Sequence, residues 1–118
     1  MKHKKKQEEQ DWGYGSVTYE DCWGLDTKLA EIISEHLHAF LNAEKYSSGA
    51  GFPGRLLDQC GQDSEKAMRL WLNIIRKMIY AFENYGQKKY QVEKDEEMQA
   101  RIKEGMQLFI DFYSDLWI

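Results

Sequence analysis

Three segments of the chain repeat apolar residues at intervals of three and four, the spacing that gathers side chains on one face of an α-helix. They cover residues 26–41, 64–85 and 93–118, which correspond to helices of about 16, 22 and 26 residues. Such helices are stable chiefly when their apolar faces pack together. The sequence therefore predicts an all-α fold, a compact bundle of three main helices.

The first predicted helix begins near Asp26 or Thr27, because both residue types cap helix N-termini. A polar stretch from Asn42 is expected to close it. We expect His36 to be a hydrogen-bonded core residue, because it falls within the apolar stripe. The stripe consists of Leu29, Ile32, Ile33, His36, Leu37, Phe40 and Leu41.

The segment after this helix is expected to be irregular, since residues 43–62 contain four glycines and the only proline. Pro53 disfavours a helical conformation at Phe52, and residues 55–59 can add one helical turn. Long loops in compact domains are more often functional or self-packed than empty. Phe52 and Arg55 are therefore candidate interface residues.

The second predicted helix is capped by Asp63 or Ser64 and ends before Gly86. Its apolar face is expected to place Trp71 in the core. The stripe consists of Ala67, Met68, Trp71, Ile74, Ile75, Met78, Ile79 and Phe82.

The third predicted helix begins near Val92 or Glu93 and continues to the last residue. Gly105 lies in its interior, where glycine costs up to about 1 kcal/mol relative to alanine, so we expect another helix to approach closely there. The stripe consists of Met98, Ile102, Met106, Phe109, Phe112 or Tyr113, and Leu116.

Four more apolar residues lie off this stripe: Leu108, Ile110, Trp117 and Ile118. Burying one large apolar side chain is worth about 1.5–3 kcal/mol, so we expect another surface to cover them. Two alternatives remain open. Either the aromatic arm described next folds over this face, or a second copy of the chain does, which would make the protein a homo-oligomer.

An aromatic arm precedes the first helix, and a charged stretch precedes the arm. Residues 1–11 are predicted to be a flexible tail, whereas residues 12–118 are predicted to form a single helical domain. Thr18 and Asp21 have capping-box spacing, which predicts a short helical turn after Thr18. Three residues of the arm are candidate interface residues: Trp12, Tyr14 and Trp23.

The charge distribution argues against binding of nucleic acid. Four lysines within residues 1–6 contribute +4 to a net charge of −4, so residues 7–118 carry −8. Nucleic-acid-binding domains instead present a basic face. Only two cysteines, no leading apolar segment and no membrane-spanning stretch are visible, so we expect a protein of the cytoplasm that does not enter the membrane.

No motif for catalysis or for metal binding is recognisable. Cys22, Cys60, His36 and His38 lack the spacing of a zinc site, and the sequence contains neither a GxSxG motif nor a phosphate-binding loop. Glu93 and Glu96 form one ExxE pair, but no ExxD partner motif accompanies it. We therefore expect no catalytic residue, no metal and no cofactor.

Several segments, in this order, resemble a widespread group of small bacteriophage proteins that have no established activity. The similarity covers residues 19–118 and implies a phage or prophage origin. It supplies no catalytic residues. The segments are DCWGLDTKLAEII (21–33), GFP (51–53), Trp71, KMIYAFE (77–83), RIKEGMQLF (101–109) and LW (116–117).

Three functional hypotheses follow. The first is a non-enzymatic phage accessory protein that binds a host or defence protein through its aromatic surface. The second is an oligomeric protein that sequesters a nucleotide, with Arg55, Arg76 or Lys77 meeting the phosphate. The third is a metal-dependent nucleotide hydrolase, which would need Glu93 or Glu96.

Overall fold

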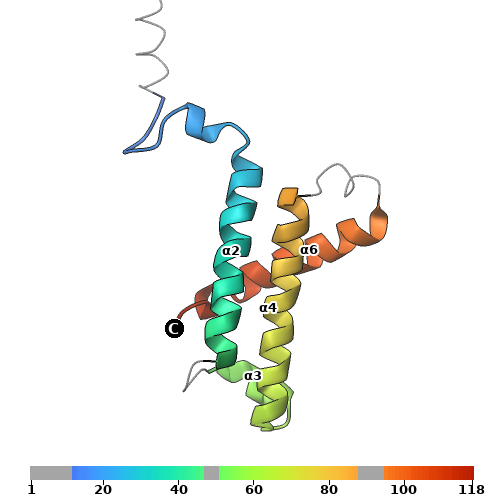
Figure 1. The fold of residues 1–118 in the computed structure, drawn as a ribbon. Helices are drawn as coiled ribbons and strands as arrows, with labels where there is room; N and C mark the ends of the chain where they lie inside the picture. The colour runs from blue at the N-terminus through green and yellow to red at the C-terminus, as the bar shows by residue number, and fades with distance from the viewer. Residues whose placement is uncertain (1–11, 47–50, 88–94) are drawn as a thin grey trace, which may run out of the picture.

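Three long helices form the fold, which is known from a computed structural model that describes residues 12–46, 51–87 and 95–118. They are α2 (Leu25–Tyr46), α4 (Ser64–Gln87) and α6 (Glu96–Asp111). Figure 1 shows that α2 and α4 run side by side in opposite directions, whereas α6 crosses both. A short helix, α3 (Gly54–Gln59), closes one end, and single 3-10 turns lie at Glu20–Cys22 and Tyr113–Asp115. The described residues form no strand, so the predicted all-α bundle is confirmed.

Helix α4 supplies most of the hydrophobic core. Trp71 is 1% exposed and packs against the rings of Phe40 from α2 and Phe112 from the C-terminal end, at centroid distances of 6.3 and 5.6 Å. The predicted stripe of α4 is confirmed, with Met68 only partly buried. The buried apolar residues of α4 are Ala67, Trp71, Ile74, Ile75, Met78, Ile79, Ala81 and Phe82.

Helices α4 and α6 cross at Gly105. A Cβ atom added to Gly105 would collide with the Lys77 carbonyl oxygen and lie 2.5 Å from the Ala81 Cβ. Only glycine allows this separation, because backbone atoms of α4 occupy the space that any side chain would need. The predicted close approach of another helix is confirmed.

Local capping residues fix the starts of α4 and α6. Asp63 accepts a hydrogen bond from the Lys66 N–H at 3.1 Å, and Asp95 accepts one from the Met98 N–H at 3.0 Å. The predicted turn after Thr18 is also present as the 3-10 turn at Glu20–Cys22.

The predicted ends of the helices need correction. Helix α2 continues past Asn42 to Tyr46, because Glu44 is buried and accepts a hydrogen bond from the Trp71 indole N–H at 3.1 Å. Burial raises the pKa of the Glu44 carboxyl, and the Trp71 hydrogen bond partly offsets that rise. Helix α4 likewise continues through Gly86 to Gln87.

Helix α6 is shorter than predicted at its C-terminal end. It stops at Asp111 and is followed by the 3-10 turn Tyr113–Asp115, so the prediction that it continues to the last residue is wrong. At its start, Asp95 is the N-cap. The predicted starts at Val92 and Glu93 lie outside the described residues.

The apolar stripe of α2 divides into a buried and an exposed part. Leu37 is buried and Ile33, Phe40 and Leu41 are partly buried, whereas the other three members, Leu29, Ile32 and His36, are exposed. The prediction that His36 is a core residue is therefore wrong; its Nδ1 lies 2.7 Å from the carbonyl oxygen of Ile32 on the same helix. The physical reason is that α2 packs mainly on α4, which covers only one side of a stripe broader than a single helix contact.

The aromatic arm does not fold over the C-terminal face, which corrects the first of the two alternatives. Figure 1 shows the arm leaving the N-terminal end of α2 and pointing away from the C-terminus. Leu108 was predicted to lie off the core, but it is half-buried and packs against it. Ile110, Trp117 and Ile118 remain exposed. None of the helices in the described parts of the chain is long and apolar enough to cross a membrane.

Candidate functional site

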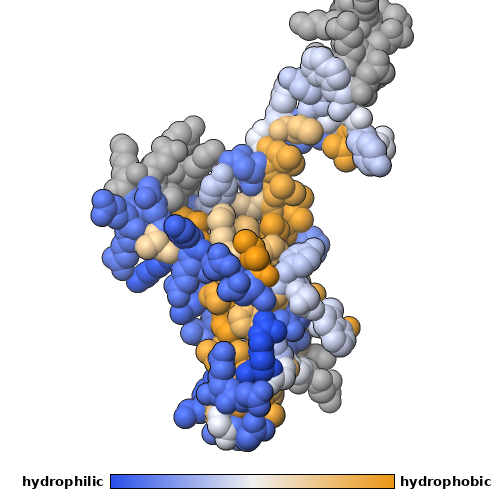
Figure 2. Space-filling model, turned by 180° about the vertical axis from the view of Figure 1, so that it is seen from behind, coloured by the Kyte–Doolittle hydropathy of each residue, from blue (hydrophilic) through white to orange (hydrophobic). Residues whose placement is uncertain are grey.

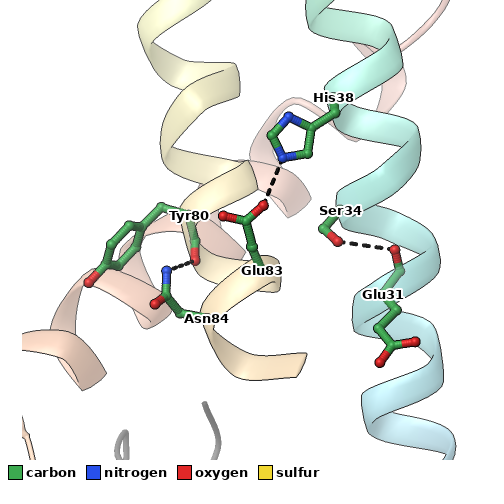
Figure 3. Close-up of polar contacts among 6 residues, drawn as sticks. All are labelled: Glu31, Ser34, His38, Tyr80, Glu83 and Asn84. Carbon is green, nitrogen blue, oxygen red and sulfur yellow. Dashed lines mark hydrogen bonds and ion pairs between the residues drawn. The ribbon is translucent and has the colours of Figure 1, made fainter. Parts of the chain in front are cut away.

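Polar contacts fix the rotation of α2 against α4 and so decide which side of α2 is exposed. His38 Nε2 of α2 lies 2.8 Å from Glu83 Oε2 of α4 (Figure 3). Near the start of α2, the Tyr85 hydroxyl donates to the Asp26 carboxylate. These contacts turn one side of α2 toward α4 and leave the opposite side uncovered.

The uncovered side carries three large aliphatic residues, Leu25, Leu29 and Ile32, which are 44–52% exposed. They follow one another at spacings of four and three, and His36 continues the row. We call these four residues the α2 face. Figure 2 shows apolar side chains gathered along α2 from its N-terminal end to the region where α6 crosses. An apolar surface of this kind usually marks an interaction site.

An apolar groove continues the α2 face toward the C-terminus. It has a volume of about 340 Å³ and lies between α2 and the end of α6. Ile32 and His36 belong to both the α2 face and the groove. The residues that line it are Ile32, Ile33, His36, Leu37, Phe40, Phe109 and Leu116.

The residues after α6 add exposed apolar side chains beside this groove. The Tyr113 ring packs edge-on against Phe109, which lines the groove, at a centroid distance of 5.5 Å. Trp117 and Ile118 directly follow Leu116, another lining residue, and are 74% and 78% exposed. These last residues therefore offer large apolar groups that the bundle itself does not cover.

Arg55 anchors this C-terminal segment. Its guanidinium lies 3.0 Å from Asp115 Oδ2, donates to the Asp111 carbonyl oxygen at 3.0 Å and sits over the Phe112 ring, 4.2 Å from its centroid. The Arg55 charge is thus engaged within the chain. Phe52, the other predicted interface residue of this loop, is half-buried and packs against the core.

The arm keeps its aromatic residues exposed by local structure alone. Tyr14 and Val17 form a two-residue bridge across a turn in which Gly15 has φ +59°, and the Trp12, Tyr19 and Trp23 rings pack edge to face in sequence. Trp12 is 65% exposed and Tyr14 91%.

A capping box holds the base of the arm. The Thr18 N–H donates to Asp21 Oδ2 at 2.8 Å, and the Asp21 N–H donates to the Thr18 hydroxyl at 3.3 Å. The bond from the Thr18 backbone N–H lowers the pKa of Asp21 below its ordinary value. The carboxylate that closes the box is therefore ionised at neutral pH.

A separate hollow between α4 and α6 contains cationic groups. Arg76, Lys77 and Arg101 line it together with Tyr80 and Glu104, and its volume is about 340 Å³. Lys77 is paired with Glu104 at 3.2 Å, and the Arg101 guanidinium lies 5.8 Å from the centroid of the Tyr80 ring. Arg101 is also paired with Glu97 at 3.0 Å, so two of the three cations already have a carboxylate partner.

The residues suited to metal binding are not gathered in one place. No group of three or more His, Cys, Asp or Glu side chains that could hold a metal ion is present within residues 12–46, 51–87 and 95–118. Glu93 of the predicted ExxE pair lies outside the described residues, and Glu96 is an exposed residue of the first turn of α6.

Sequence reasoning missed the α2 face, because it treated the whole stripe of α2 as core. The signal was present in the width of the stripe: Leu29, Ile33 and Leu37 already follow a helical face, and Ile32 and His36 widen it. A stripe that broad needs neighbours on two sides.

Comparisons of the chain with family models, with curated proteins and with solved structures gave no match.

Proposed function

We propose that this chain is a non-enzymatic accessory protein of phage or prophage origin that acts in the bacterial cytoplasm by binding a host or defence protein. The supporting observation is the large amount of aromatic and aliphatic surface that the bundle leaves exposed on the arm and on the C-terminal segment. Exposed tryptophans are the side chains that most often dominate protein–protein binding energies.

The charges around this surface suggest the chemistry of the partner. Residues 12–46 contain six acidic residues and two lysines, so the surroundings of the arm and of α2 are acidic. Electrostatic complementarity then favours a partner whose apolar contact patch is bordered by arginine or lysine. Such a border also speeds association, because it steers the partner toward the acidic side of the bundle.

The test compares tryptophan variants with a matched control. The purified full chain serves as bait in a lysate of a bacterial host, and the captured protein is then purified and titrated directly. Trp12→Ala and Trp117→Ala should each raise the dissociation constant about 30-fold, the usual effect of removing a hot-spot aromatic group worth about 2 kcal/mol. Lys103→Ala, a charge removal at an exposed position of α6, should leave it unchanged.

Two outcomes would contradict the proposal. One is that the chain captures no protein from any host lysate at micromolar bait concentration. The other is that the tryptophan variants and the Lys103 variant bind the captured protein equally well.

An anionic ligand is the second candidate, supported by the three cations that surround Tyr80. In such a site the aromatic ring can stack on the base of a nucleotide, while the arginine and lysine side chains bind its phosphate. It ranks second because Glu97 and Glu104 already neutralise Arg101 and Lys77. A thermal-shift measurement with a panel of nucleotides, repeated on Arg76→Ala, tests it: a shift that disappears in the variant supports the site, and no shift for any nucleotide contradicts it.

A further inference from the structure

The α2 face has the spacing of a helix that pairs with another helix. Leu25, Leu29, Ile32 and His36 follow one another at intervals of four, three and four residues, as the a and d positions of a two-stranded coiled coil do. The row covers residues 25–36 and is about 17 Å long at 1.5 Å per residue. A partner helix of similar length and apolarity would cover it.

A second copy of the same helix fits this row in one antiparallel arrangement. With the two-fold axis between residues 30 and 31, Leu29 packs on Ile32 of the second copy and Leu25 packs on His36 of the second copy. The next positions outward are Lys28 and Glu35, which both lie on the open flank of the row and are both exposed. In this register Lys28, whose Nζ also donates to the Asp21 carbonyl oxygen of its own chain at 3.0 Å, faces Glu35 of the second copy, and the symmetry repeats the pair.

Other registers lose this charge complementarity. Shifting the antiparallel pair by one heptad in one direction places Lys28 opposite Lys28, and shifting it in the other direction places Glu35 opposite Glu35. A parallel pair sets Lys28 beside Ile33 and Glu35 beside Phe40, with no ion pair. Both shifted registers bring like charges together, and these repel. The charges therefore select one register out of those that the apolar row allows.

The same arrangement brings the two distant parts of the apolar surface together. In one chain the arm and the C-terminal segment lie apart along α2 (Figure 1). In the antiparallel pair Trp23 lies at the level of residue 38 of the second copy, beside the groove that contains Phe40 and Leu116. The arm of each copy would then border the C-terminal segment of the other, once at each end of the pair.

We propose that two copies of this chain pair antiparallel along their α2 faces, with Lys28 of each copy facing Glu35 of the other, and that the pair carries two identical composite surfaces, each made of one arm and one C-terminal segment. The use of those surfaces rests on the binding function proposed above, whereas the pairing is tested independently of any partner.

The first measurement is the mass of the full chain by sedimentation equilibrium at concentrations up to about 100 µM, a range that detects micromolar affinities. A dimer has twice the chain mass of 14.0 kDa. Leu29→Glu should abolish the dimer, because it places two carboxylates in the centre of the apolar row. Its circular dichroism should match that of the wild type, since Leu29 is exposed in the single chain.

Charge reversal tests the register. Lys28→Glu and Glu35→Lys should each raise the dimer dissociation constant about tenfold, because each turns both ion pairs into like-charge contacts. The double variant should recover the wild-type constant. An equimolar mixture of the two single variants should form a heterodimer more tightly than either variant pairs with itself, which happens only if residues 28 and 35 of different copies face each other.

A wild-type mass of 14.0 kDa at about 100 µM, or a dimer that Leu29→Glu leaves intact, would overturn the pairing. A dimer that both single reversals leave unchanged would overturn the register. A monomer that still captures a partner through Trp12 and Trp117 would refute the pairing and leave the binding function supported. A dimer that captures no partner would support the pairing and contradict the binding function.

Discussion

Replacement of Gly105 by alanine tests the packing of the bundle most directly, because two opposing effects can be compared in magnitude. Alanine is favoured over glycine in a helix interior by about 1 kcal/mol. Against this, the new methyl group would overlap the Lys77 carbonyl oxygen and lie 2.5 Å from the Ala81 Cβ. Overpacking costs about 1–3 kcal/mol, with the upper end expected here because a backbone atom cannot move aside.

The crossing should therefore prevail over helix propensity, and Gly105→Ala should lower the free energy of unfolding by about 1–2 kcal/mol. In urea, with a slope of about 2 kcal/mol per molar for a chain of this size, the midpoint should fall by roughly 0.5–1 M. Circular dichroism at 222 nm follows the helices during the titration. Tryptophan fluorescence follows the core through the change at Trp71, because the other three tryptophans are already exposed in the folded chain.

Two further variants separate crowding from other effects. Gly54→Ala changes a glycine at the start of α3 that has nothing within 4 Å of an added Cβ, so its unfolding midpoint should stay the same or rise. Ala81→Gly removes one of the two groups that the new methyl meets, so it should cost less in the Gly105→Ala background than in the wild type. A Gly105→Ala protein at least as stable as the wild type would refute the close crossing.

Three other perturbations have defined outcomes. Glu44→Ala should destabilise the fold by about 1–3 kcal/mol in urea titrations, because it leaves the buried Trp71 N–H without its acceptor, whereas Glu44→Gln keeps an acceptor and should cost less. The pKa of Glu44 is raised in the folded state, so between the ordinary value of 4.5 and the folded pKa the folded protein binds more protons than the unfolded chain. The free energy of unfolding should therefore fall as the pH rises through this window. Glu44→Gln should remove that part of the pH dependence. Arg55→Ala should lower the free energy of unfolding by at most about 1 kcal/mol, because its ion pair with Asp115 is half-exposed. The same variant should speed amide hydrogen exchange in the residues after 111. Arg69→Ala, at another exposed arginine, should leave that exchange unchanged.

The sequence predicted those features of the fold that depend on neighbouring residues. The apolar period of α4 placed Trp71 in the core, and the capping role of Asp63 was predicted from residue type alone. Gly105 was also interpretable, because a glycine that costs helix stability needs a compensating close contact. In each case the signal in the sequence lies within one helix, although the contact that Gly105 makes is with α4.

The features that were missed depend on contacts between distant residues. Asn42 was expected to end α2, but the helix continues because Glu44 reaches Trp71, which is 27 positions away. His36 was assigned to the core because periodicity defines a face and not the number of helices that cover it. The candidate surface was predicted in part: Ile110, Trp117 and the arm residues are exposed, whereas the α2 face was not foreseen.

The capping box at the base of the aromatic arm has a kinetic consequence. The arm is ordered by hydrogen bonds and ring contacts within residues 12–23, and Lys28 Nζ ties it to α2 by donating to the Asp21 carbonyl oxygen at 3.0 Å. The loss of conformational entropy on ordering therefore occurs when the protein folds and not when a ligand protein arrives. Recognition by the arm should accordingly resemble rigid docking, with a rate constant set by collision and charge steering and without the large heat-capacity change of coupled folding.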